Sequence, residues 1–181
     1  MKNVAAYFGK AVLRDVDEQE FYARLADVRK AIGDRAVLRA MHFFDESRRV
    51  QMQVRALKND NFAAFLNYVN ESGNASWELL QNITPLGATA HQEMAFTLVL
   101  CRKLLGGEGA VRVHGGGFAG TVLAFVPNEQ FEQFKNAMDY AIGSGSTQKL
   151  HIQQFLYKLF FCNVDIQCKV LENTSVCASG A

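Results

Sequence analysis

The chain has 181 residues, of which 49% are hydrophobic and 20% are charged, and its formal net charge at pH 7 is +1. These totals are typical of one compact domain with a hydrophobic core. With a net charge so close to zero, the chain as a whole lacks the excess of positive charge typical of proteins that bind nucleic acid or an anionic membrane. No apolar run reaches the roughly 18 residues that a membrane-spanning helix needs, and the first ten residues are too short in their apolar part for a secretion signal. We therefore expect no nucleic-acid partner and no membrane partner.

The first 105 residues show the apolar spacing of α-helices. Asp17 is placed to cap a helix that ends at Gly33-Asp34, and "ESGNAS" is expected to break a helix that begins near Phe62. Gly106-Gly107 is placed to end the last helix of this part. The predicted helices are 17–32, 35–58, 62–70, a short 77–82 and 91–105, with a loop at 85–89.

After Gly107 the pattern changes to that of strands. "GAVRVH" alternates, and "TVLAFV" is a continuous apolar run, as in a strand buried on both faces. Pro127 opens a further helix that Gly143 and Gly145 close, and "KLHI" at 149–152 is expected to be a third strand. Helices that precede a small, mostly antiparallel sheet predict an α+β fold with the helices packed on the sheet.

The residues after Ile152 differ from the rest of the chain. They are apolar, rich in cysteine and without a clear period, and they end in small and polar residues. We expect 153–181 to be a divergent tail that is partly disordered. The four cysteines form no CxxC pair, which argues against a zinc site and favours reduced thiols and a cytoplasmic protein.

The segment "HGGGFAG", His114 to Gly120, lies between two predicted strands. It lacks the G-x-G-x-x-G that leads into a helix in dinucleotide-binding folds, and it lacks the G-K-[ST] ending of a nucleotide P-loop. Successive glycines let main-chain amides converge on an anion, and we expect the ring of Phe118 to insert into the core and brace the loop. The alternative is a glycine-rich hairpin without a ligand.

Three further residues could contact a ligand or could have structural roles. His42 is more typical of a core or hydrogen-bonding histidine than of a catalytic one. His114 borders the glycine loop, so it either faces a ligand held by that loop or points outward from its strand. Trp77, the single tryptophan, is expected to pack in the protein rather than stack on a ligand.

Other polar residues have suitable chemistry without a spacing that shows convergence. Glu46 and Arg49 are three residues apart and predict an ion pair on a helix surface. Arg112, Asn70 and Glu71 could contribute to a site, but nothing in the sequence brings them together. No Ser/His/Asp or Cys/His set and no metal-ligand cluster is recognisable, so no catalytic and no metal-binding residue is assigned.

Several segments together resemble one protein family. "RVHGGGFAGTVLAFVP" resembles the third conserved motif of the GHMP small-molecule kinases, specifically that of galactokinases. "FGKAVLRDVDEQEF", "GDRAVLRAMHFFDESRRV" and "ALKNDNFAAFLNYVNESGNASWELLQN" occur in the order and approximate spacing of the C-terminal half of a galactokinase. The resemblance covers about Met1 to Ile152.

The resemblance implies a fold, an activity and a site. Residues 1–152 would form the ferredoxin-like C-terminal domain of a GHMP kinase. The family transfers the γ-phosphate of ATP to the anomeric hydroxyl of galactose with ATP and Mg²⁺, so galactose and ATP are the implied partners. His114 would contact substrate. The implied cofactor-binding residues are Gly115, Gly116, Gly117, Phe118, Ala119 and Gly120.

The sequence also departs from the family. Ala119 stands where galactokinases have a glycine, and the family's final Arg-Pro-x-Gly turn is replaced, as a shifted frame or rearranged gene would produce. The family's phosphate loop and its catalytic Asp with an Arg partner belong to an N-terminal half whose signatures we do not find. We therefore expect the chain to be inactive alone and to need a missing N-terminal half or to self-associate. The alternatives are a non-catalytic binding module and the C-terminal half of another GHMP kinase of mevalonate or homoserine type.

Overall fold

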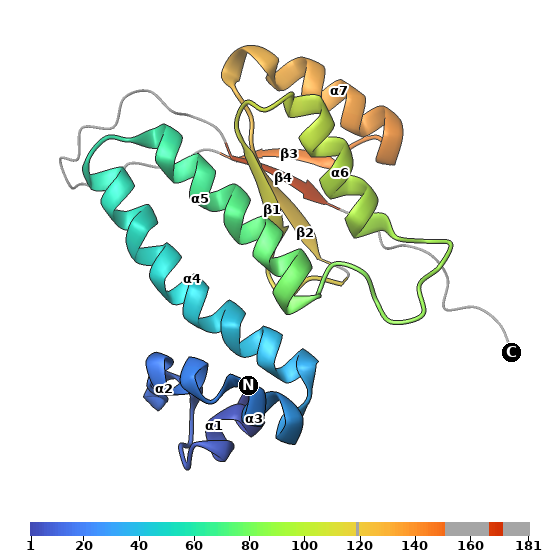
Figure 1. The fold of residues 1–181 in the computed structure, drawn as a ribbon. Coiled ribbons are helices and arrows are strands. Elements are labelled where there is room, and N and C mark those ends of the chain that lie inside the picture. Colours follow the sequence, from blue (N-terminus) through green and yellow to red (C-terminus); the bar gives the residue numbers. More distant parts are fainter. Residues whose placement is uncertain (119, 151–166, 172–181) are drawn as a thin grey trace, which may run out of the picture.

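The N-terminal part of the molecule is a cluster of short helices packed against the first half of one long helix. The computed structural model describes residues 1–118, 120–150 and 167–171 (Figure 1). In the core of this cluster Phe21 is fully buried, with its ring 5.3 Å from that of Phe44. The helices are α1 (Lys2–Tyr7), α2 (Glu18–Ala23), α3 (Leu25–Ile32) and the long α4 (Asp34–Lys58).

The predicted helix 17–32 is two helices. Asp17 caps the first one as expected, since its carboxylate accepts from the main-chain N–H of Glu20 at 2.8 Å. Arg24 then leaves helical geometry with a φ of −107° and a ψ of 18°, and α3 begins at the next residue. This break turns α3 back onto α4, which lets Val28 be buried in the same cluster.

α5 (Phe62–Ala75) packs along α4 and continues through the segment expected to break it. The prediction of a break at "ESGNAS" is wrong because each residue of that segment that disfavours a helix has a structural role there. A Cβ on Gly73 would lie 2.8 Å from the carbonyl oxygen of Val111, so glycine lets the helix approach the sheet closely. The hydroxyl of Ser72 donates to Glu46, and that of Ser76 donates to the carbonyl of Ser72. A π-helical turn, Ser76–Leu80, follows directly.

The sheet has four antiparallel strands in the order β1-β2-β4-β3. The predicted α+β class, with helices on a small antiparallel sheet, is therefore confirmed. The strand predicted at 149–152 occupies Thr147–Leu150, and 151–152 lie outside the described residues. The strands are β1 (Ala110–His114), β2 (Thr121–Phe125), β3 (Thr147–Leu150) and β4 (Gln167–Leu171). β4 lies within the range that the sequence assigns to the tail.

Helices cover both faces of the β1–β2 hairpin (Figure 1). On one face, α6 (Glu93–Leu105) and α7 (Phe131–Ile142) bury Val111, Val113 and Val122 in the largest core cluster. On the other face, α5 packs against Ala110 and Phe125, and this face also carries Arg112 and His114. The hairpin end that joins β1 to β2 lies beyond the α5 contacts, and it contains the glycine loop.

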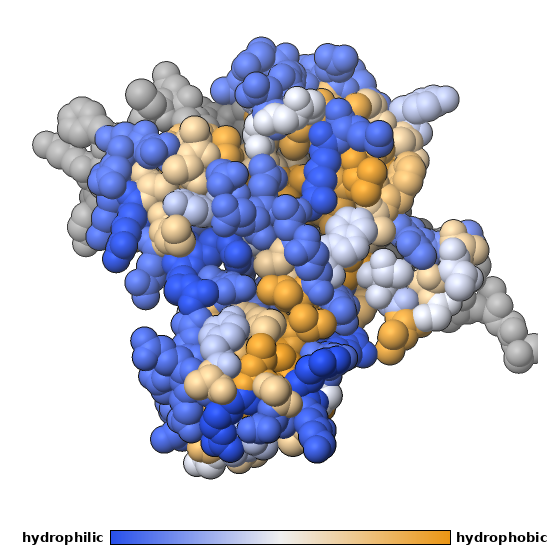
Figure 2. Space-filling view, in the orientation of Figure 1, coloured by the Kyte–Doolittle hydropathy of each residue, from blue (hydrophilic) through white to orange (hydrophobic). Residues whose placement is uncertain are grey.

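Some apolar side chains stay exposed. Figure 2 shows apolar residues gathered over α6, on which Phe96 is 55% exposed. Among the helices of the described residues, none combines the length and the apolar character that crossing a membrane requires.

Candidate functional site

The glycine loop is a surface turn between β1 and β2. His114, Gly115 and Gly116 are exposed, and Gly117 is half-buried. Gly115 and Gly117 have φ values of 81° and 79°, which the absence of a Cβ permits. The main-chain N–H groups of Gly115 and Gly116 make no hydrogen bond to another described residue. Two adjacent amides on an exposed turn can therefore meet a ligand.

Asn82 holds the loop from below. The main-chain N–H of Phe118 donates to the carbonyl oxygen of Asn82 at 2.7 Å, and the side-chain Nδ2 of Asn82 donates to the carbonyl oxygen of Gly116 at 3.1 Å. A Cβ on Gly117 would lie 2.2 Å from the same Asn82 oxygen. The amide of Phe118 is thus already paired within the protein, while those of Gly115 and Gly116 have no partner among the described residues.

Phe118 does not brace the loop from inside the core as expected. It is 40% exposed and has a φ of 59°, in the left-handed region. In this conformation its amide donates to the carbonyl oxygen of Asn82, and the side chain lies at the surface. Ala119, where the sequence departs from the family motif, lies outside the described residues.

His114 is the last residue of β1 and pairs with Thr121 across the hairpin. It is exposed and lies on the same face of the sheet as Arg112, two residues earlier. The structure therefore places His114 at the base of the glycine loop, where its ring has access to solvent. This position is compatible with both roles that the sequence leaves open.

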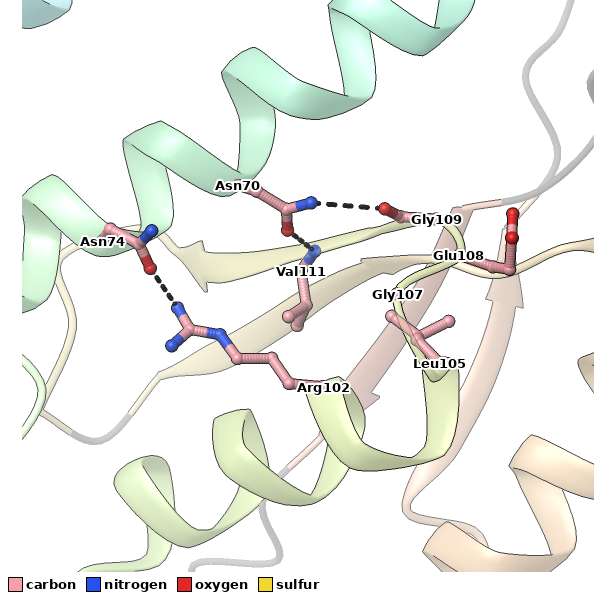
Figure 3. A pocket seen from close by; sticks show the side chains of 8 residues that line it. All are labelled: Asn70, Asn74, Arg102, Leu105, Gly107, Glu108, Gly109 and Val111. Atoms are coloured by element: carbon pink, nitrogen blue, oxygen red, sulfur yellow. Dashed lines mark hydrogen bonds between the residues drawn. The ribbon is translucent and has the colours of Figure 1, made fainter.

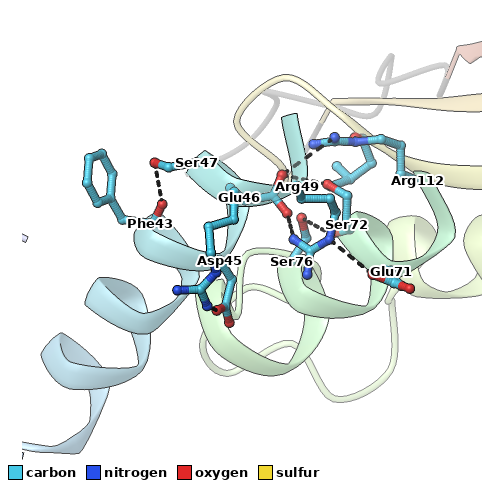
Figure 4. A network of polar contacts seen from close by, with 11 residues as sticks. Phe43, Asp45, Glu46, Ser47, Arg49, Glu71, Ser72, Ser76 and Arg112 are labelled. Carbon is cyan, nitrogen blue, oxygen red and sulfur yellow. Dashed lines mark hydrogen bonds and ion pairs between the residues drawn. The ribbon is translucent and has the colours of Figure 1, made fainter. Parts of the chain in front are cut away.

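A network of charged residues joins α4, α5 and β1 (Figure 4). Glu46 is at its centre: it forms the predicted ion pair with Arg49, although both side chains are largely buried and not on the helix surface as expected. Glu46 also accepts from the hydroxyl of Ser72 at 2.7 Å and lies 3.9 Å from the guanidinium of Arg112. Arg49 also lies 3.5 Å from a carboxylate oxygen of Glu71. The structure thus brings Arg112 and Glu71 together, but two arginines are balanced by two glutamates. We assign the network a structural role, since its charges are already paired.

His42 lies one helical turn before this network and is buried. The pKa of its imidazole is lowered, chiefly because the side chain is buried, and the nearby Arg49 and Arg112 lower it further. Glu46 and a hydrogen bond to the main chain of Ala75 act in the opposite direction and raise this pKa. Among the described residues its Nδ1 has no hydrogen-bond partner. The expectation of a core histidine agrees with this environment.

A polar cavity lies at the opposite end of β1 (Figure 3). The side chain of Asn70 spans the edge of the strand: its Nδ2 donates to the carbonyl of Gly109 at 3.2 Å and its Oδ1 accepts from the N–H of Val111 at 3.0 Å. Arg102 points across the cavity and donates to Asn74 at 2.8 Å. Asn70 therefore closes the edge of β1 and lies at the far end of that strand from the glycine loop.

Trp77 packs partly against the largest core cluster, with the guanidinium of Arg102 over its ring at 5.7 Å. This contact is what the sequence leads us to expect of the single tryptophan. Within the described part of the chain, no group of three or more His, Cys, Asp or Glu side chains is arranged to hold a metal ion.

Sequence reasoning missed Asn82. The one local signal is the dipeptide Gln81-Asn82 at the end of a helical pattern, because asparagine side chains often satisfy main-chain groups where a helix stops. Gln81 has left-handed φ and ψ of 55° and 46°, which turns the chain toward the loop. The partner of Asn82 is 34 residues away in sequence, so no local pattern could have identified it.

Comparison with known proteins identifies similar enzymes. The chain is 29% identical over 153 residues to a galactokinase of Glaesserella parasuis, 28% over 150 residues to one of Actinobacillus pleuropneumoniae, and 27% over 134 residues to one of Haemophilus influenzae. These matches cover 84%, 82% and 74% of this chain. No family model matches it.

The chain spans about a third of the length of these curated relatives, since the matches cover 37%, 37% and 33% of them. Partial coverage of long relatives, together with high coverage of this chain, is consistent with the C-terminal half that the motifs indicate. The resemblance to galactokinases that the sequence motifs predict is thereby confirmed.

Proposed function

We propose that this chain is the part of a galactokinase-like enzyme that brings the glycine loop to ATP and sugar. The reaction is transfer of the γ-phosphate of ATP to the anomeric hydroxyl of galactose. The observation that carries the proposal is the exposed loop with two amides that have no partner among the described residues, in a chain similar to galactokinases over most of its length.

The chemistry of the loop suits an anion. Adjacent main-chain N–H groups without internal partners can donate to the oxygens of a phosphate, and no Cβ at Gly115 or Gly116 stands in the way. Phosphoryl transfer depends chiefly on positioning and on electrostatic stabilisation of the transferring group. The amides of Gly115 and Gly116 supply both in part, and His114 at the base of the loop is placed to contact a hydroxyl or phosphate oxygen. Bound Mg²⁺ in such enzymes neutralises phosphate charge.

The fold we propose is that of the ferredoxin-like C-terminal domain of GHMP kinases, formed by 1–152. The helices on both faces of the antiparallel hairpin and the glycine loop between its strands support this assignment. Residues 153–181 form a divergent tail in this proposal, apart from β4, which pairs with β2 and β3. We propose a cytoplasmic location by the same likeness.

Calorimetric titration tests the proposal with the whole chain. We expect ATP to bind with and without Mg²⁺, and Gly116→Asp to abolish that binding, because it sets a negative charge beside the amides at a position with open space. Asn128→Asp is the matched control, since it adds the same charge at an exposed residue beyond the far end of β2. Equal affinity of both variants would contradict the proposal.

Activity is a separate measurement. We expect no transfer of phosphate to galactose by this chain alone in a coupled ADP-release assay. The glycine loop would supply only part of a kinase site, and we find no signature of the family's phosphate loop or catalytic Asp. Clear turnover would overturn that expectation while leaving the assignment of the loop intact.

A second candidate function is a non-catalytic interaction module. It is favoured by the exposed apolar pair Val50 and Val54, one turn apart on α4, at 53% and 46% exposure. Light scattering over a concentration series distinguishes the two candidates. A dimer that Val50→Asp makes monomeric, in a chain that binds no ATP, would support the module.

A further inference from the structure

The segment that ends the α5 region leads directly to the glycine loop. After the π-helical turn Ser76–Leu80, the left-handed Gln81 reverses the chain and places Asn82 against the loop. Asn82 is only 4% exposed, although it is a polar residue next to a surface turn. Burial of an asparagine at such a position needs a reason other than packing.

Asn82 contacts the loop on both sides of Gly117. Its side-chain Nδ2 donates to the carbonyl of Gly116, and its main-chain oxygen accepts from the N–H of Phe118. The backbone of Gly117 lies so close between these contacts that an added Cβ would be 2.6 Å from Nδ2. The two hydrogen bonds therefore fix the loop at consecutive peptide groups.

The contacts are made although one polar atom remains unsatisfied. Among the described residues, the buried Oδ1 of Asn82 has no hydrogen-bond partner. An unpaired buried oxygen costs free energy that an apolar side chain of similar size would avoid. Exceptions of this kind call for an explanation, and functional sites are one of the places where they are found.

We propose that Asn82 is the positioning residue of the glycine loop. By holding the carbonyl of Gly116 and the N–H of Phe118, it keeps the exposed Gly115 and Gly116 in a conformation in which their amides have no partner among the described residues. This inference rests on the proposed function, in which those amides bind phosphate oxygens. Asn82 touches no ligand itself; it keeps the loop in the conformation that binds.

Removal of the side-chain donor is expected to release one side of the loop. The affinity of a ligand falls in proportion to the fraction of molecules whose loop has the binding conformation. If that fraction falls to about one in ten, the apparent affinity for ATP falls about tenfold. Protection of the Phe118 amide from hydrogen exchange falls with it, because each opening of the loop exposes that amide.

The experiment compares Asn82→Ala and Asn82→Asp with the unaltered chain. Asp has nearly the size of Asn, but an ionised carboxylate cannot donate to the carbonyl of Gly116. The matched control is Asn74→Ala, which removes one asparagine hydrogen bond at the other end of β1. ATP binding is measured by calorimetry, and exchange of the Phe118 amide is measured by NMR, with circular dichroism to verify the fold.

We expect both Asn82 variants to lose about tenfold in ATP affinity and nearly all of the Phe118 protection, because a loop that is closed in one molecule in ten leaves that amide open in most molecules, and we expect the control to change in neither. Unchanged Phe118 protection would overturn the positioning role, and so would faster exchange with unchanged ATP affinity. A wild-type chain that binds no ATP would instead overturn the proposed function, and Phe118 exchange would then decide the positioning role by itself. If the Asn82 variants do not fold, Gly117→Ala displaces the loop from the other side, with Gly107→Ala as its control, since Gly107 also has a positive φ and open space around it but lies outside the glycine loop.

Discussion

The two ends of β1 are both bordered by glycine and both held by an asparagine, but the glycines are surrounded differently. At the start of the strand, a Cβ on Gly109 would lie 2.0 Å from the carbonyl oxygen of Phe125. At the other end, a Cβ on Gly115 or Gly116 would have no atom within 4 Å. Asn70 pairs with the strand edge at the first end, and Asn82 pairs with the loop at the second.

The difference separates two reasons for a glycine. The backbone at position 109 packs so closely against β2 that only glycine fits, and this packing is a sufficient reason for Gly109. Packing does not account for Gly115 and Gly116, because side chains there would meet open space. A ligand can approach the backbone at glycines that packing does not require, on a turn whose amides have no partner in the part of the chain that the structure describes. The glycine loop, and not Gly109, is therefore the candidate site.

The largest expected effect is that of Gly109→Ala. The added Cβ collides with main-chain atoms that cannot rotate away, and the φ of 71° is strained for alanine. We expect the free energy of unfolding to fall by roughly 3 kcal/mol, measured by urea denaturation. Gly107→Ala is the matched control, with a φ of 98° and nothing within 4 Å, and we expect it to lose only about 1 kcal/mol. Equal losses would mean that backbone strain alone explains Gly109.

The next effect is that of Gly117→Ala in the glycine loop. Gly117 and Gly115 have nearly equal φ values of 79° and 81°, but only a Cβ on Gly117 collides with Asn82. We expect the free energy of unfolding to fall by about 2 kcal/mol for Gly117→Ala and about 1 kcal/mol for Gly115→Ala. The exposed loop can shift, so the loss is smaller than at Gly109. Should Gly115→Ala prove as destabilising as Gly117→Ala, the contact with Asn82 would be of little importance to stability.

Asn70→Ala tests how much the hydrogen bonds of Asn70 contribute to stability at the Gly109 end of β1. The substitution leaves the carbonyl of Gly109 and the N–H of Val111 without their side-chain partner. Partly buried main-chain groups that lose a hydrogen bond cost about 1.5 kcal/mol in unfolding free energy, which thermal or urea denaturation would detect. Asn67→Ala is the control, because its side chain bonds only to Glu71 on the same helix among the described residues, and little change is expected there.

Much of the fold followed from local patterns in the sequence. The switch from helical to alternating spacing after Gly107 placed β1 and β2, and Gly106, with its left-handed φ of 59°, ends α6 as predicted. The errors arose where tertiary contacts override local preference. Gly73 was interpreted as part of a helix break, but it is the position at which α5 touches the backbone of β1.

For the candidate site, the sequence located the loop and its exposed backbone but not what holds it. The sequence predicts the ring of Phe118 in the core, because aromatic residues are usually buried, whereas in the structure the amide of Phe118 pairs with Asn82 and the ring lies at the surface. That bond joins residues 36 apart in sequence numbering (118 − 82 = 36) and is formed only once the chain has folded.

The middle of β1 faces the charged network, next to which His42 is buried. The smallest effect that we expect is there: the free energy of unfolding should depend on pH through His42. Burial lowers the pKa of this imidazole below its ordinary value of 6.5. At a pH between the lowered and the ordinary value, the unfolded chain binds a proton that the folded chain does not, so the free energy of unfolding falls as the pH falls below about 6.5.

His42→Gln removes the titrating group, so we expect the melting temperature of this variant to change less between about pH 5 and pH 8 than that of the unaltered chain. The control is His91→Gln, which makes the same substitution at a histidine whose side chain is 89% exposed. Since the guanidinium of Arg112 also lowers the pKa of His42, Arg112→Gln should make the loss of stability at low pH smaller. A wild-type melting temperature that stays constant from pH 8 to pH 5 would show that His42 becomes protonated in the folded chain without cost, and that the middle of β1 is more open to water than its burial indicates.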